Sequence, residues 1–83
     1  MTPIETIRNF IAQNFYIPEE IALADEASLL DQGIVDSTGV LEVTAFLEST
    51  YGIEIVDDEI VPGNMDSIVA IAAFVTRKCA WAA

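Results

Sequence analysis

The sequence predicts an all-α protein, a small four-helix bundle with three main helices, one short helix and a long loop between the first two. Apolar residues recur at three- and four-residue spacing in three segments, which is the period of one helical face. Residues that typically start and stop helices flank those segments. The chain has 83 residues, enough for one core, so we expect a single domain over residues 1–83.

The first main helix is predicted over residues 3–15. Thr2 and Glu5 have the spacing of a capping box, and Pro3 suits the first helical position, where its missing N–H is not needed. Pro18 ends the segment, because its ring disfavours the helical conformation in the residue before it. The apolar stripe that this helix turns toward the core consists of Ile4, Ile7, Ile11 and Phe15.

Residues 16–35 form the predicted long loop, with Gly33 as a turn residue. Loops of about 20 residues are uncommon in compact domains unless they have a purpose or packing of their own. We therefore expect the apolar residues of this loop to lie across the core; they are Ile17, Ile21, Leu23, Leu29, Leu30 and Ile34.

The second main helix is predicted over residues 37–50. Asp36 is a good N-cap, and Gly52 stands where a left-handed residue is favoured after the last turn. Phe46 fits neither the core stripe nor the outer face of this helix. The core stripe consists of Val40, Val43, Leu47 and Tyr51.

The segment after this helix contains the short predicted helix. Residues 53–56 alternate in polarity like a strand, but no other segment offers a partner strand, so they are expected to be an extended loop. The short helix is predicted over residues 57–61, ended by Pro62 and Gly63. Its acidic first turn is either a solvated surface or a secondary contact for a basic partner.

The last main helix is predicted over residues 66–78. Arg77 and Lys78 then lie in its last turn, where cations complement the helix dipole. In the tail that follows, Trp81 is expected to cover an apolar patch, and Cys79 has nothing except the two cations to activate its thiol.

The charge balance excludes several classes of function. There are 14 Asp and Glu against 3 Lys and Arg, no His, and a net charge of -11, yet 53% of residues are hydrophobic and the mean hydropathy is +0.46. A disordered acidic tail would have low hydropathy. Duplex nucleic acid and anionic membranes require cations that this chain lacks. Without His, a His-based triad and a His/Cys zinc site are excluded, whereas partners with basic surfaces are expected.

The sequence predicts a cytoplasmic protein. Its start lacks the cationic and apolar regions of a secretory signal, and its longest apolar run, Ile68–Val75, is far shorter than the ~20 residues that span a bilayer. A lone Cys79 forms no intramolecular disulfide, which fits a reducing compartment.

Ser37 is the strongest candidate for a functional residue. It follows Gly33-Ile34-Val35-Asp36 at the point where the long loop enters the second helix. Free backbone N–H groups and the helix dipole favour an anion there, so a phosphoester on Ser37 is electrostatically well placed. The dipeptide alone is typical of helix capping, and a second copy, Asp66-Ser67, opens the last helix.

The outer face of the helix over residues 37–50 distinguishes the first copy. At about 100° per residue, a small apolar strip begins beside Ser37 and has acidic flanks. Such a strip suits a partner with an apolar groove and a basic rim, although a solvated helix face with one exposed Leu is the alternative. The strip consists of Thr38, Leu41 and Ala45, and its flanks are Glu42 and Glu48.

These residues resemble the acyl and peptidyl carrier proteins, over essentially the whole chain in length, acidity and helix layout. The specific part is Gly-x-x-Asp-Ser at the start of the second helix, with an aromatic-Gly-Ile-x-Ile segment fourteen residues after the serine. In this chain the motifs read Leu30-Asp31-Gln32-Gly33-Ile34-Val35-Asp36-Ser37, then Val40-Leu41-Glu42-Val43, Phe46-Leu47-Glu48 and Tyr51-Gly52-Ile53-Glu54-Ile55.

The resemblance implies an acyl-carrier-protein-like bundle with 4′-phosphopantetheine covalently on Ser37 and Asp36 flanking the site. A phosphopantetheinyl transferase would deliver the arm from coenzyme A, an adenylating enzyme would load acyl or aminoacyl groups as thioesters, and acyl-processing enzymes with basic docking surfaces would follow. It implies that Thr38, Leu41, Glu42, Ala45 and Glu48 form the face that these partners read. We expect a monomer that binds neither nucleic acid nor membrane.

Two positions depart from the family pattern. Thr38 stands where the family most often has Leu, and Gly39 stands where a small or acidic residue often follows. These departures favour a free-standing carrier in nonribosomal peptide, polyketide or related biosynthesis. No base accompanies Ser37, so the chain is expected to be no enzyme itself. The alternative is an acidic helical adaptor that binds basic partners and carries no prosthetic group.

Overall fold

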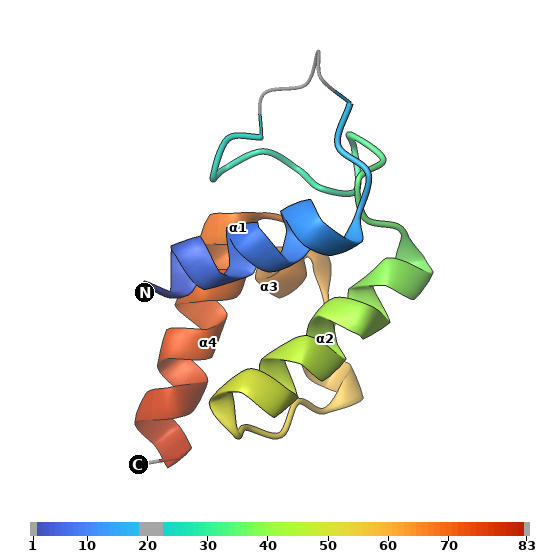
Figure 1. Cartoon of the computed structure of the whole chain (residues 1–83). Coiled ribbons are helices and arrows are strands. Elements are labelled where there is room, and N and C mark those ends of the chain that lie inside the picture. Colours follow the sequence, from blue (N-terminus) through green and yellow to red (C-terminus); the bar gives the residue numbers. More distant parts are fainter. Residues whose placement is uncertain (1, 19–22, 83) are drawn as a thin grey trace.

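Four α-helices and one short 3₁₀ helix make up the computed structural model of the chain (Figure 1). It describes residues 2–18 and 23–82, with side chains only as far as residue 79. No strand occurs within these ranges, so the predicted all-helical class is confirmed. The elements are α1 (Pro3–Asn14), α2 (Ser37–Tyr51), the 3₁₀ helix η1 (Asp57–Glu59), α3 (Pro62–Met65) and α4 (Ile68–Ala82).

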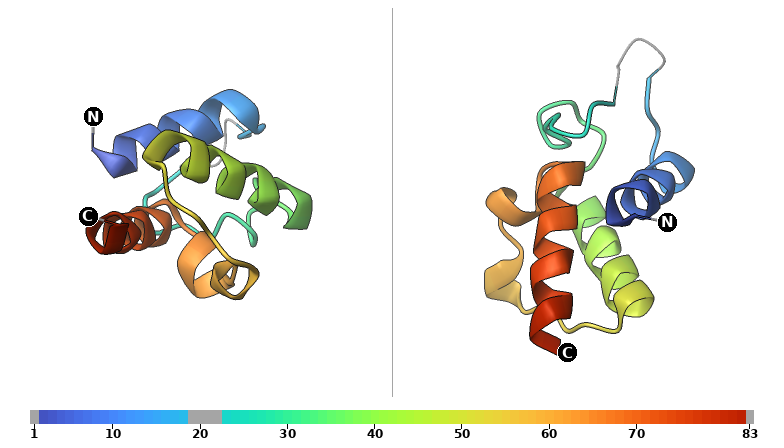
Figure 2. Two further views of the ribbon diagram at one scale, coloured as in Figure 1. Left: turned by 90° about the horizontal axis from the view of Figure 1, so that it is seen from below. Right: turned by 90° about the vertical axis from the view of Figure 1, so that its left-hand side faces the viewer.

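The long helix α4 organises the arrangement. Both α1 and α3 pack against α4, and in the right-hand view of Figure 2 they lie to either side of it. α2 meets α1 through the rings of Phe46 and Phe10, which stack with centroids 4.0 Å apart. The place of Phe46, which the helical periodicity left unexplained, is therefore the seam between α1 and α2.

The core is apolar and draws on all four α-helices as well as on the loops. α1 contributes Ile7 and Ile11, and α2 contributes Val43 and Leu47, as their stripes predict. The 53–56 segment is an extended loop, as predicted, and buries its alternate residues Ile53 and Ile55. The remaining buried apolar side chains are Leu29, Ile34, Val35, Met65, Ile68, Ile71, Ala72, Phe74 and Val75.

The helix ends follow the local signals in the sequence. Thr2 Oγ1 accepts a hydrogen bond from the Glu5 amide at 3.2 Å, and Pro3 is the first residue of α1. Gly52 ends α2 in the left-handed conformation, with φ of 65°. α1 ends one residue earlier than predicted, and α2 extends one residue further, to Tyr51.

The long loop is only partly built into the core. Leu29 and Ile34 are buried and Gly33 makes a left-handed turn, as predicted, while Ile17 and Leu23 pack on the core edge. The prediction that Leu30 is a core residue is wrong, because its side chain is 39% exposed. Ile21 lies outside the described residues.

The C-terminal half departs most from its predicted boundaries. The helix predicted over residues 57–61 is a 3₁₀ turn of three residues, and Pro62 begins α3 instead of ending a helix, as a proline in the first helical position can. α4 begins at Ile68 and continues to Ala82, so Arg77 and Lys78 do not lie in its last turn. The side chain of Trp81 lies outside the described part of the chain.

Candidate functional site

Ser37 is the first residue of α2 and is exposed. The predicted cap is formed by the residue before it, because Asp36 Oδ1 accepts a hydrogen bond from the Gly39 amide at 2.7 Å. The carbonyl oxygen of Asp36 accepts another from the Val40 amide at 3.0 Å. Asp36 thus fixes the first turn of α2, and the hydroxyl of Ser37 is left at the helix end, facing solvent.

An open groove of about 210 Å³ lies beside Ser37. Ser37, at the start of α2, is the one polar residue among those that line this groove. The groove is available because α3 packs against α4 and leaves its other side facing α2. The apolar lining residues are Leu30, Val40, Ile60, Val61, Pro62 and Met65.

Asp66 holds the loop that supplies one wall of this groove. Its carboxylate accepts hydrogen bonds from the Leu30 amide at 2.9 Å and from Ser28 Oγ at 2.6 Å. Its carbonyl oxygen accepts another from the Leu29 amide at 2.7 Å. These contacts explain why Leu30 is turned to the groove rim while its neighbour Leu29 is buried.

The second Asp-Ser dipeptide is therefore a structural element. Ser67 Oγ accepts a hydrogen bond from the Ala70 amide at 3.1 Å, which caps α4, and Ser67 is half-buried. Asp66 is committed to the long loop. Of these two serines, Ser37 is the one that is exposed and lines the apolar groove.

The outward face of α2 lies largely as its periodicity predicts. Thr38, Leu41, Glu42 and Ala45 are exposed, with Leu41 59% accessible. Glu48 differs, because its side chain is half-buried and Oε2 accepts a hydrogen bond from the Ile55 amide at 2.9 Å. The exposed strip beside Ser37 is thus present, but one of its two acidic flanks is used within the fold.

Gly39 is a residue of this site that the helical pattern did not explain. It is buried, and a Cβ placed on it would lie 2.7 Å from Phe15 Cε1 and 3.2 Å from Val35 Cγ1. The absence of a side chain lets Phe15, at the end of α1, approach the first turn of α2. The sequence signal that marks it is a glycine within the first turns of a predicted helix.

All three basic side chains are engaged within the chain. Arg8 forms an ion pair with Asp25, and its Nη1 donates to the Leu23 carbonyl oxygen at 2.6 Å, which ties α1 to the long loop. Arg77 donates to Asn64 and lies over the ring of Phe74, 5.9 Å from its centroid.

Lys78 forms the third such contact, with Glu59 at 2.9 Å. The Val56 amide, which donates to this carboxylate, and then Lys78 hold the pKa of Glu59 below its usual value of 4.5. Glu59 is thus an internal partner for Lys78, and Asp57 and Asp58 are the exposed acids of the cluster.

The fold and site define a small all-helical protein that presents one serine at a helix start beside an apolar groove. None of the helices in the described ranges has the length and apolar character needed to cross a membrane. Comparison with protein-family models and with curated proteins finds no match for this chain.

Proposed function

We propose that this chain is an acyl or aminoacyl carrier protein that holds biosynthetic intermediates as thioesters on a 4′-phosphopantetheine arm attached to Ser37. The observation that carries the proposal is the position of Ser37, exposed at the start of α2 and at the edge of the apolar groove. The Gly-x-x-Asp-Ser element and the acidic surface, which resemble those of carrier proteins, agree with it.

The residues around Ser37 fit such an arm. An exposed hydroxyl is accessible to a modifying enzyme, and the N-terminal end of a helix favours the negative charge of a phosphodiester. The groove has a volume of about 210 Å³ and offers apolar side chains directly beside the attachment point. Attachment would form a bond between Ser37 Oγ and the phosphorus next to pantetheine, and break that phosphorus's bond to the adenine-nucleotide part of coenzyme A.

The chain's own residues would position the arm and present its cargo to partner enzymes. When bound, the arm supplies a thiol that carries acyl groups as thioesters. Asp36 keeps the first turn of α2 intact, so Ser37 stays at a defined place. Tethering raises the effective concentration of the cargo at a docked enzyme, which is the contribution expected of a carrier.

The exposed face of α2 is the proposed docking surface. Leu41 is its largest exposed apolar side chain, and Glu42 is an exposed acid beside it. A partner with a basic rim would be attracted by the net charge of -11 and would bind briefly enough to be exchanged. Thr38 and Ala45 extend this surface toward both ends of the strip.

The test is to incubate the chain with coenzyme A and a promiscuous phosphopantetheinyl transferase and to measure its intact mass. A gain of one phosphopantetheine is expected for the wild type and for Ser67→Ala, and none for Ser37→Ala. Ser67 is the matched control because it is also preceded by Asp and also lies at a helix start, but its Oγ caps α4.

Two results would contradict the proposal. One is no gain of mass with several transferases on chain whose circular dichroism shows it to be folded. The other is a gain that persists in Ser37→Ala. The first result would favour the alternative, an acidic helical adaptor that binds basic partners through the same exposed face of α2. The second would mean that a residue other than Ser37 accepts the arm.

A further inference from the structure

The segment from Asp57 to Met65 lies between two hollows. On one side is the Ser37 groove, which Ile60, Val61, Pro62 and Met65 line. On the other side is a hollow of about 500 Å³ lined by Glu59, Asn64, Phe74, Arg77 and Lys78. The segment is therefore a wall with open space on both faces, unlike the closely packed elements of a protein interior.

Few apolar contacts hold this wall in place. Met65 is its one buried side chain, while Ile60 is half-buried and Val61 is 41% exposed. Segments with little buried apolar surface are those that open at low free-energy cost. Packing through Met65 and Ile60 therefore holds only part of the wall, and other contacts hold the rest.

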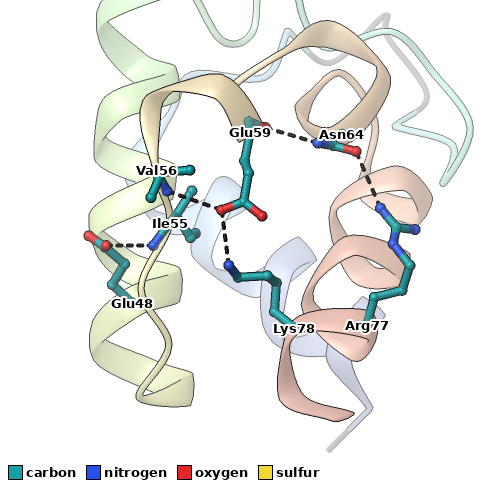
Figure 3. Close-up of polar contacts among 7 residues, drawn as sticks. All are labelled: Glu48, Ile55, Val56, Glu59, Asn64, Arg77 and Lys78. Carbon is teal, nitrogen blue, oxygen red and sulfur yellow. Dashed lines mark hydrogen bonds and ion pairs between the residues drawn. The ribbon is translucent and has the colours of Figure 1, made fainter. Parts of the chain in front are cut away.

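Polar contacts among Glu59, Asn64, Arg77 and Lys78 also hold the wall, and we name this set of residues the clasp (Figure 3). Glu59 Oε1 accepts from Lys78 Nζ at 2.9 Å and from the Val56 amide at 3.1 Å. Asn64 Nδ2 donates to the Glu59 carbonyl oxygen at 2.9 Å, and Asn64 Oδ1 accepts from Arg77 at 3.3 Å. The clasp thus links η1 and α3 to α4 (Figure 3), and its side chains line the 500 Å³ hollow.

A second contact fixes the other end of the segment to α2. Glu48 Oε2 accepts from the Ile55 amide at 2.9 Å, just before η1 (Figure 3). The wall is therefore anchored to α2 at its start and to α4 along its length. Between these anchors, the apolar residues Ile60 and Val61 face Leu30 and Val40 across the groove.

We propose that the clasp of Glu59, Asn64, Arg77 and Lys78 holds the groove beside Ser37 open. Closure of an apolar groove in water lowers the free energy of the chain, since it removes apolar surface from solvent. The clasp opposes this closure, because it ties the wall to α4 on the side away from α2. Glu59, Asn64, Arg77 and Lys78 are in this sense positioning residues for the groove.

The use of the open groove for an acyl group rests on the carrier function proposed above, but the clasp itself does not. Its test uses the unmodified chain, so a failure of Ser37 to accept the arm leaves the result unaffected. Likewise, a groove that stays open without the clasp leaves the attachment of the arm unaffected.

The experiment is a fluorescence titration with Nile red, a neutral apolar dye that the charge of -11 does not repel. Two variants weaken the clasp at its Glu59–Lys78 contact and leave the contact between Asn64 and Arg77 in place. Glu59→Gln keeps an oxygen acceptor but loses the charge, and Lys78→Met keeps the apolar stem but loses the ammonium group. Methyl NMR spectra of the same samples locate the dye through the shifts of Val40 and Val61, which line the groove.

We expect both variants to bind the dye about two- to fivefold more weakly, in line with the modest strength of an accessible ion pair. NOEs between the methyl groups of Val40 and Val61 should become stronger as the wall closes. Lys78→Arg should retain wild-type binding, because the cation is kept. Asp25→Asn should do so too, since it removes the ion pair with Arg8 that ties α1 to the long loop, away from the groove lining.

Several outcomes would overturn the proposal. One is that dye binding and NOEs are unchanged in both variants. Another is that the variants bind the dye more tightly, which would mean that the clasp keeps the groove shut. A third is that Asp25→Asn weakens dye binding as much as they do. Failure of the wild type to bind the dye would also overturn it, since the groove would then not be an open site. So would dye-induced shifts of the Phe74 ring in aromatic NMR spectra while the methyl groups of Val40 and Val61 do not move.

Discussion

Replacing Gly39 with Ala should destabilise the protein, although helix propensity alone predicts the opposite. Gly39 lies in the first turns of α2, where Ala is favoured over Gly by about 0.5–1 kcal/mol. The added Cβ, however, would lie 2.7 Å from Phe15 Cε1 and 3.2 Å from Val35 Cγ1. Overpacking of this kind costs about 1–3 kcal/mol, so we expect a net loss of about 1 kcal/mol.

Urea unfolding followed by circular dichroism measures this change, and a loss of about 1 kcal/mol corresponds to a fall in Tm of about 4–8 °C in a domain of this size. Gly63→Ala is the matched control, because no heavy atom other than those of its chain neighbours and of the backbone of its own helix lies within 4 Å of its Cβ position in α3. It should stabilise the chain by about 0.5–1 kcal/mol.

The background Phe15→Ala isolates the cause of the loss. With the ring removed, the closest contact of the new Cβ disappears, and Gly39→Ala should become neutral or stabilising by about 0.5 kcal/mol. The reasoning is refuted if Gly39→Ala stabilises the wild type as much as Gly63→Ala does, or if its effect is the same with and without Phe15.

Three further predictions concern other contacts. Asp66→Ala should lower the free energy of unfolding by about 1–3 kcal/mol, because it removes the acceptor of two hydrogen bonds from the long loop. Ser67→Ala should lower it by about 1 kcal/mol, because it removes the side-chain cap of α4. Equal effects of the two variants in urea unfolding would contradict this. The pKa of Glu59 is lowered, so the stability that its charge contributes is present above pH 4.5 and is lost as the pH falls through the folded-state pKa. Urea titrations between about pH 6 and pH 3 should therefore show that the stability difference between wild type and Glu59→Gln shrinks toward zero in acid. A difference that stays constant with pH would contradict this. Phe46→Ala should cost about 2–3 kcal/mol because it removes the ring stacked between α1 and α2, while Leu41→Ala, at an exposed position, should stay within about 0.5 kcal/mol; similar losses for both would argue against the packing described.

The features that the sequence predicted well are local ones. A cap such as Thr2 or Asp36 acts on an amide three residues away, and the left-handed Gly52 follows directly after the helix that it ends. These signals depend only on neighbouring residues, so they can be recognised without the fold. The same applies to the buried stripes of α1 and α2.

The features that the sequence missed depend on distant residues. Leu30 is turned outward because its amide is bonded to Asp66, 36 positions away. The groove beside Ser37 combines residues from the long loop, α2, the η1–α3 connection and α3. No local pattern encodes such a combination, and the reason for Gly39 likewise became apparent only from the approach of Phe15.

The distribution of charge links the acidity of the chain to the proposed site. The chain has only 3 Lys and Arg residues, and each is bound to another part of the fold: Arg8 to the long loop, and Arg77 and Lys78 to the wall of the groove. None is left to neutralise the exposed acids next to Ser37, which include Asp36 and Glu42. The same scarcity of cations thus links two features of the chain: the negative face that would attract a basic partner, and the clasp that positions the groove. Each cation that stabilises the fold is one fewer at the surface beside the serine.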